Sequence, residues 1–126
     1  MVKSKKNESD SAKLSNLIIK GIKEKKGRNI TQMDLKEVDG AVTDYFIICE
    51  ANTSTQIGAI RDSIEKEVRS GLDEKPWHVE GTSNLEWVLL DYVNVVAHIF
   101  QPEKRAFYNV EGLWGDATIK NIEVEY

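Results

Sequence analysis

Apolar residues near the start of the chain recur at the spacing of an α-helix. They are Leu14, Leu17, Ile18, Gly21 and Ile22. Asp10 and Ser11 precede this run as the expected N-caps, and Gly27 follows it as the expected stop. We therefore expect an amphipathic first helix, with lysines in its last turns that complement the negative end of the helix dipole.

Two later segments have the same helical spacing. Thr53 and Gln56 have the spacing of a capping box, and an apolar stripe runs from there to Gly71. The stripe consists of Ile57, Ile60, Ile64 and Val68. Pro102 suits the first position of a third helix that ends at Gly115. The predicted apolar face of that helix consists of Phe107, Val110 and Trp114.

Short runs rich in β-branched and aromatic residues predict the strands. These runs are residues 30–38, 45–49, 87–92, 95–100 and 119–126. Asp39-Gly40 and Val93-Asn94 are the expected turns, whereas the segment that holds His78 is expected to be a loop. The order of elements predicts an α/β or α+β fold, a mixed β-sheet flanked by helices. We expect residues 1–126 to form one domain, with a flexible N-terminus over residues 1–11.

Charge narrows the range of partners. The 126 residues have a formal net charge of −4, but residues 30–126 alone hold 8 basic and 18 acidic side chains. Such an acidic body is poorly suited to nucleic acid as its main ligand and is better suited to basic proteins. The basic start of the chain is interpreted as a solvated helix end, so contact with RNA is expected to be minor.

Composition also limits compartment and chemistry. Cys49 is the single cysteine, which excludes an internal disulfide and a cysteine-rich metal site and indicates a cytoplasmic protein. No apolar run is long enough to span a membrane. The glycines form no phosphate-binding motif, and neither His78 nor His98 belongs to a nucleophile motif. No cofactor and no metal are expected.

Carboxylates leave an enzymatic alternative open. Two acids on one strand face can hold Mg²⁺, and Glu123 with Glu125 have that spacing. Asp44 and Asp91 lie at the ends of apolar strands, where capping acids are common. A divergent, metal-dependent nucleotidyltransferase that uses these acids is therefore the alternative to a binding protein.

The segment Glu86 to Tyr92 is apolar on both of its alternating faces. Trp87, Leu89 and Asp91 point one way, and the residues between them point the other way. One interpretation is a central strand covered by helices on both sides. The other is that Trp87 and Leu89, rimmed by acids, form an exposed patch for a basic partner, because tryptophan is enriched at the centre of protein interfaces.

Several segments in the same order resemble the ribosomal silencing factor family, also called Iojap-like. They are TDYFII at 43–48, EG at 80–81, WVLLD at 87–91, VVAHIF at 95–100, RAFY at 105–108 and EGLW at 111–114. The resemblance covers about residues 12–118. It implies a nucleotidyltransferase-like fold without catalytic residues and a translational repressor that is not an enzyme.

The resemblance also implies partners. A member of this family binds the large ribosomal subunit through ribosomal protein L-fourteen and sterically blocks association with the small subunit, chiefly when nutrients are limiting. Family members also form homodimers, so a homodimer is expected as well. A small dimeric adaptor without a ribosomal role is the remaining alternative.

The resemblance further implies a partner-binding site. By their positions in the family pattern, its residues are Trp87, Leu89, Asp91, His98, Arg105, Tyr108 and Glu111. The chain departs from the pattern in two places. Val93-Asn94 replaces a usual Gly-Asp, which puts the geometry of that turn in question, and Val110 and Gly112 alter the last element.

Overall fold

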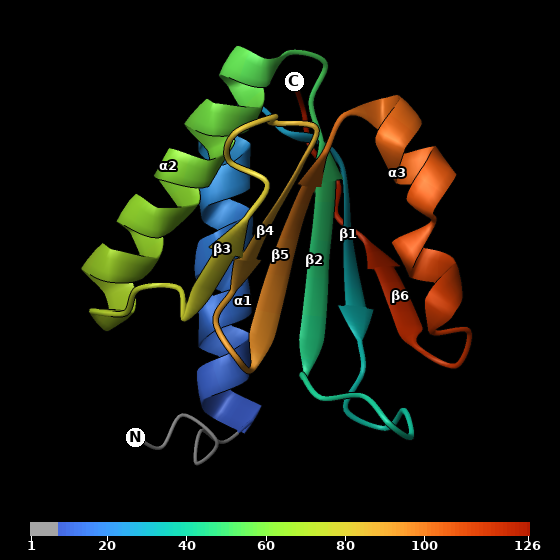
Figure 1. Cartoon of the computed structure of the whole chain (residues 1–126). Helices are drawn as coiled ribbons and strands as arrows, with labels where there is room; N and C mark the ends of the chain where they lie inside the picture. The colour runs from blue at the N-terminus through green and yellow to red at the C-terminus, as the bar shows by residue number, and fades with distance from the viewer. Residues whose placement is uncertain (1–7) are drawn as a thin grey trace.

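A six-stranded mixed sheet forms the centre of the molecule (Figure 1). The structure is a computed structural model that describes residues 8–126. The strands are β1 (Arg28–Asp34), β2 (Tyr45–Glu50), β3 (His78–Glu80), β4 (Trp87–Asp91), β5 (Val95–Phe100) and β6 (Thr118–Asn121), in the order β3-β4-β5-β2-β1-β6. β2 and β5 are parallel, and the other neighbours are antiparallel. The predicted mixed sheet is confirmed.

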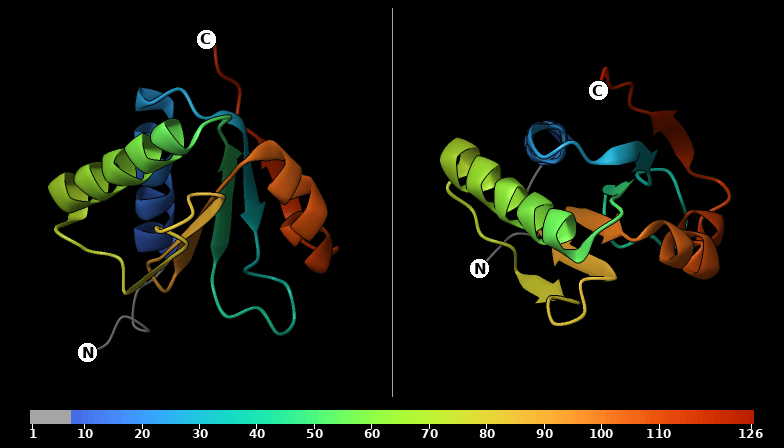
Figure 2. Two further views of the ribbon diagram at one scale, coloured as in Figure 1. Left: turned by 45° about the horizontal axis from the view of Figure 1, so that its top comes forward. Right: turned by 90° about the horizontal axis from the view of Figure 1, so that it is seen from above.

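The helices are divided unequally between the two faces of the sheet. They are α1 (Glu8–Glu24), α2 (Ser54–Leu72), α3 (Pro102–Tyr108) and the 3₁₀ turn η2 (Val110–Leu113). Seen from above, α1 and α2 lie on one side of the sheet and α3 lies on the other (Figure 2). In the described part of the chain, no helix is both long enough and apolar enough to cross a membrane.

The main core lies between the sheet and the two long helices. It includes Leu14, Ile18 and Ile22 of α1, the predicted stripe of α2, and Ile47, Cys49, Val88, Leu90, Ala97 and Ile99 of the strands. A smaller cluster on the other face consists of Met33, Ile48, Phe100 and Val110. Each face of the sheet thus has its own core, and this is why the central strands are apolar on both faces.

The expected N-caps of α1 need correction, whereas the expected stop at Gly27 is confirmed. Asp10 and Ser11 are inside the helix rather than at its N-cap. The buried Ser11 hydroxyl donates to the Asp44 carboxylate at 2.5 Å. Ser11 therefore joins α1 to the start of β2 and does not cap the helix. At the other end Lys26 adopts a positive φ of 61°, and the Gly27 N–H closes the helix on the Ile22 carbonyl at 3.0 Å. Of the expected flexible segment 1–11, residues 1–7 lie outside the described residues and residues 8–11 belong to α1.

The capping box of α2 is half confirmed. The Thr53 hydroxyl accepts from the Gln56 backbone N–H at 3.1 Å, as its sequence position predicts. The Gln56 side chain, however, donates to the carbonyls of Lys25 and Lys26 at 3.1 and 3.2 Å. It therefore joins the start of α2 to the end of α1.

Two other predictions about elements were wrong. The third helix does not run to Gly115, because Asn109 takes a left-handed conformation and separates α3 from η2. Phe107 is consequently 78% exposed rather than packed beside Val110. His78 is not in a loop but starts β3, a three-residue edge strand that was too short and too polar to predict.

Two glycines in the long helices should respond oppositely to alanine. A Cβ at Gly21 of α1 would lie 2.7 Å from Ile64 Cα, whereas one at Gly58 of α2 would meet only Leu85 Cδ1 at 3.9 Å. We expect Gly21→Ala to lower the free energy of unfolding by about 2 kcal/mol, as overpacking does. Gly58→Ala should raise it by about 0.5 kcal/mol through helix propensity. Urea unfolding of both variants measures this, and a Gly21→Ala protein as stable as wild type would contradict the close helix crossing.

Candidate functional site

On one face of the neighbouring strands β4 and β5, the β4 side chains are partly exposed and the β5 side chains are buried, and α3 contacts this face through Tyr108 beside Trp87. The antiparallel pairing of the two strands sets three cross-strand rows on this face: Trp87 with Phe100, Leu89 with His98, and Asp91 with Val96. We call these six residues the β4–β5 face. The intervening Val88 and Leu90 are fully buried under α1 and α2. Helices thus cover one face of β4, while Trp87, Leu89 and Asp91 on the other face are partly exposed.

Trp87 is held in a fixed orientation rather than lying free on the surface. Its indole stacks on Phe100 with ring centroids 4.9 Å apart, and Tyr108 of α3 lies at 4.9 Å on another side. The indole Nε1–H donates to Nδ1 of His98 at 3.1 Å. A large aromatic group that is already ordered loses little conformational entropy when it binds a partner.

His98 is buried and neutral. It is 3% exposed, and burial lowers its pKa to about 4. Because Nδ1 accepts from Trp87, the ring proton belongs on Nε2, which has no partner among the described residues. His98 is thus a buried imidazole that accepts a hydrogen bond from the neighbouring strand.

Arg105 anchors α3 to the sheet. Its guanidinium donates to both carboxylate oxygens of Glu111, to Glu50, to the Thr31 hydroxyl and to the Asn29 carbonyl, at 2.6 to 3.3 Å. Burial works to lower its pKa, but hydrogen bonds and charge from Glu111, and then from Glu50, hold the pKa above its ordinary value. All five donors of the side chain are used within the chain. Arg105 and Glu111 therefore pair with each other and fix the position of the helix beside Trp87.

Tyr108 borders a small hollow on the other side of Trp87. The hollow has a volume of about 160 Å³ and is lined by Gly81, Asn84, Glu86, Trp87, Lys104 and Tyr108. Tyr108 is 48% exposed. Gly81 has a φ of 86°, and a Cβ there would lie 1.9 Å from the Trp87 carbonyl oxygen, so no other residue fits. The EG pair of the sequence pattern thus positions the start of β4.

Asp91 and the following turn form the opposite end of the face. Its carboxylate Oδ1 accepts from the Val93 backbone N–H at 2.7 Å. The expected turn at Val93-Asn94 is present, with Val93 at a φ of 78°. A β-branched residue in this region is a true outlier, so the replacement of the usual glycine leaves the turn in place but strained.

One apolar hollow was missed by the sequence analysis. It has a volume of about 280 Å³ and is lined by Val42, Thr43, Trp77, Asp91, Val93 and Val96. These residues come from separate parts of the chain that meet beyond the ends of β2 and β4. No local sequence pattern connects these residues. The one feature of the sequence that could have indicated the hollow is Trp77, an isolated tryptophan in a predicted loop.

The acids of the enzymatic alternative are dispersed. Asp44 is bonded to Ser11 of α1, whereas Asp91 lies on the β4–β5 face. Glu123 lines a polar hollow beside Arg105 at the far edge of the sheet. Across residues 8–126, no group of three or more His, Cys, Asp and Glu side chains is placed to hold a metal ion. Cys49 is buried, and burial raises the pKa of its thiol to about 12, so it is not a nucleophile at neutral pH.

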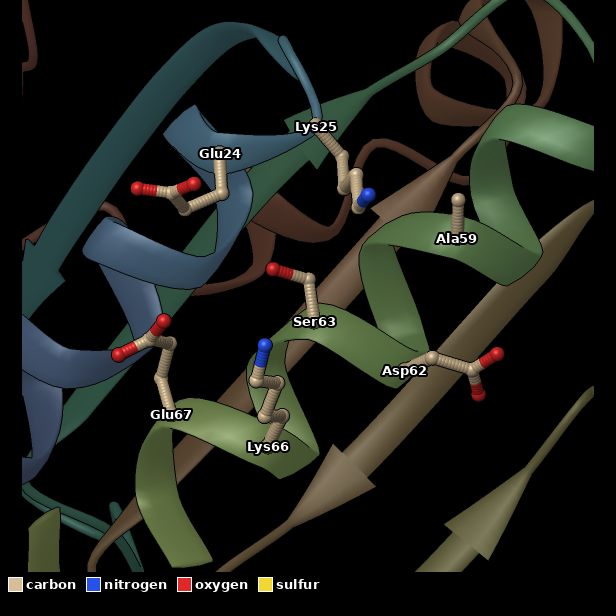
Figure 3. A pocket seen from close by; sticks show the side chains of 7 residues that line it. All are labelled: Glu24, Lys25, Ala59, Asp62, Ser63, Lys66 and Glu67. Atoms are coloured by element: carbon tan, nitrogen blue, oxygen red, sulfur yellow. The ribbon is translucent and has the colours of Figure 1, made fainter. Parts of the chain in front are cut away.

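A charged groove lies between α1 and α2 (Figure 3). It has a volume of about 350 Å³ and is lined by Glu24, Lys25, Ala59, Asp62, Ser63, Lys66 and Glu67. Ser63 donates to the Gly21 carbonyl at 2.8 Å, and Glu67 pairs with Lys20 at 3.2 Å. Both signs of charge are mixed in this groove, and its polar groups serve the helix crossing.

Comparisons with known proteins agree on one family. The family model described as "Ribosomal silencing factor during starvation" matches residues 8–126. The ribosomal silencing factor of Halalkalibacterium halodurans is 33% identical over 111 residues, which are 87% of this chain and 92% of that protein. The one from Bacillus subtilis is 35% identical over 101 residues, 79% of this chain and 83% of that protein.

A solved structure has the same fold. A crystal structure of a Chromobacterium violaceum protein superposes with a TM-score of 0.77 and covers 91% of this chain and 90% of its own. Its sequence identity is 24%, so this likeness supports the fold alone.

Burial of His98 predicts a specific pH dependence of stability. Between its unfolded pKa of 6.5 and its folded pKa of about 4, the unfolded chain binds a proton that the folded chain does not. Stability is therefore lost as the pH falls through this interval, by about 2 kcal/mol between pH 7 and pH 5. Urea unfolding of wild type and His98→Gln at both pH values isolates this contribution, because the other titrating groups are common to both. Equal pH dependence of the two proteins would contradict it.

Proposed function

The chain belongs to the ribosomal silencing factor family, and we propose that it represses translation by binding the large ribosomal subunit through ribosomal protein L-fourteen. Bound there, it blocks association with the small subunit, chiefly under nutrient limitation. The relatives are named as silencing factors, which is a regulatory role and is consistent with a protein that is not an enzyme.

The β4–β5 face is the observation that supports this proposal best. It presents an oriented indole at Trp87, an apolar neighbour at Leu89 and a carboxylate at Asp91, in line along one strand. Aromatic anchors surrounded by a polar rim are typical of the centres of protein interfaces. An acidic rim on an acidic body selects a cationic partner, because complementary potentials favour encounter.

The predicted site residues take different parts in the proposed contact. Trp87 and Leu89 touch the partner, Asp91 faces its basic groups, and the half-exposed Tyr108 extends the aromatic surface. His98 is a positioning residue, because it acts through its hydrogen bond to Trp87. Arg105 and Glu111 are positioning residues too, because their ion pair holds α3 and thereby Tyr108.

Steric exclusion requires no chemistry from this chain. A rigid body seated on the surface at which the subunits meet prevents their joining by volume alone. The structural demands are then a firm anchor and a stiff scaffold. The two-sided core of the central strands supplies the stiffness.

Loss of the indole should weaken binding strongly. We expect Trp87→Ala to reduce affinity for purified large subunits by about 2 kcal/mol or more, roughly 30-fold, as for buried aromatic anchors. Co-sedimentation through a sucrose cushion measures this. Trp114→Ala, which removes a partly buried indole packed on the same small core cluster as Trp87 but outside the β4–β5 face, is the matched control and should bind like wild type. Equal binding by Trp87→Ala and wild type would disprove the assignment of the site.

The charge of Asp91 should be separable from its role in the turn. Asp91→Asn keeps an acceptor for the Val93 N–H and removes the charge, so binding should weaken several-fold while stability changes little. Asp91→Lys adds repulsion against a cationic partner and should weaken binding further. The difference between the variants should shrink as salt is raised, because screening reduces both effects. Metal-dependent nucleotide turnover that disappears in Asp91→Asn would instead support the enzymatic alternative.

A further inference from the structure

The apolar hollow at the end of the β4–β5 face is lined in part by apolar side chains that are exposed to solvent. Val42 is 93% exposed and Trp77 is 72% exposed, and both line it. Large apolar groups gathered around a concavity are typical of binding sites rather than of the ordinary surface of a monomer.

The hollow is continuous with the proposed interface. Asp91 and Val96 form the last cross-strand row of the β4–β5 face, and both also line the hollow. A partner seated on Trp87 and Leu89 therefore reaches the hollow by continuing along the same two strands.

Backbone strain at Val93 is a second observation. Its φ of 78° suits glycine and disfavours a β-branched residue, yet the chain has valine there, with its side chain lining the hollow. Strain that the rest of the structure sustains is found preferentially at functional sites. The valine side chain is thus the feature that sets this turn apart from a glycine turn.

The chemistry of the wall indicates the kind of group that fits. Trp77, Val93 and Val96 provide apolar surface, and Asp91 places a carboxylate at one side. Oδ1 of Asp91 is used by the Val93 N–H, whereas no bond to Oδ2 is found among residues 8–126. Lysine and arginine side chains combine an apolar stem with a cationic head, and the head also favours the face of an indole.

We propose that this hollow is a second anchor site, which receives a lysine or arginine side chain of the same basic ribosomal protein. The stem packs between Trp77, Val93 and Val96, and the cationic head meets the Asp91 carboxylate. The inference rests on the proposed function and adds a specificity determinant to it. Glycine at position 93 would adopt the same turn conformation but would not provide the side chain that lines the hollow.

A second copy of the chain is a poorer occupant. In a symmetric dimer the same patch lies on both sides of the interface, so the Asp91 carboxylates of both copies are placed in one interface that holds no cationic partner from this patch. Residues 30–126 hold 18 acidic against 8 basic side chains, so two bodies also repel. A basic protein meets neither penalty.

The test compares variants that separate binding from folding. Labelled chain is titrated into purified large subunits, and the midpoint of urea unfolding is measured in parallel. We expect Trp77→Ala to weaken binding about 10-fold with stability unchanged. Val93→Gly should weaken binding about three-fold or more while raising the unfolding midpoint, a combination that a merely structural role does not produce. Ile119→Ala, at the opposite edge of the sheet, is the control and should match wild type.

The outcomes distinguish this inference from the proposed function. If Trp87→Ala weakens binding but Trp77→Ala and Val93→Gly bind like wild type, the second anchor is wrong and the proposed function stands. If wild type does not bind large subunits, both are wrong. If Trp77→Ala alters self-association measured by analytical ultracentrifugation, with binding to subunits unchanged, the hollow takes a second copy and the inference is overturned.

Discussion

Unequal helix coverage of the sheet is the constraint on which the rest of this structure depends. α1 and α2, of 17 and 19 residues, pack against one face, and within residues 8–126 only the 7-residue α3 and the 4-residue η2 are available for the other. The short pair lies over Met33, Ile48 and Phe100 and contacts Trp87 through Tyr108, and the outward row of β4 remains partly exposed. The partly exposed row of Trp87, Leu89 and Asp91 follows from this geometry, so the proposed binding surface lies on a rigid sheet rather than on a loop. A site on regular elements keeps its geometry better than one on loops.

The guanidinium of Arg105 connects elements that are far apart in the sequence. Arg105 joins α3 to β1, β2 and η2 through five hydrogen bonds, and its side chain is 11% exposed. Its removal leaves the partly buried Glu50 and Glu111 without their common partner, which destabilises the structure. The ring contact between Tyr108 and Trp87 depends on where α3 lies, and hence on this ion pair. Arg105 and Glu111, which the resemblance assigns to the binding site, can therefore act indirectly, by holding in place the residues that would contact a partner.

The sequence predicted those features that repeat with a regular period. The stripe of α2, the apolar runs of β2 and β5, and the alternation of β4 each follow from the burial of one face or two, and the structure confirms them. It did not predict the break at Asn109, because a left-handed residue inside a helical pattern leaves no periodic signal. β3 was missed because a three-residue edge strand with one half-buried valine between two exposed polar residues is too short to show a periodic pattern. The hollow beside Trp77 was missed for a different reason, since its walls meet only through the tertiary fold.

A partly exposed aromatic face on a sheet favours self-association. The negative charge of this chain affects both self-association and the binding of a partner. Asp91 stands at one end of the Trp87 row and Glu86 precedes it, on a body with an excess of acidic side chains. Two such faces repel one another, whereas a cationic surface is attracted to each of them. In the proposed function, the same carboxylates therefore oppose pairing of identical copies and favour a basic partner. Because attraction and exclusion come from one set of charges, a substitution that reverses a charge at the rim alters partner choice in both directions at once.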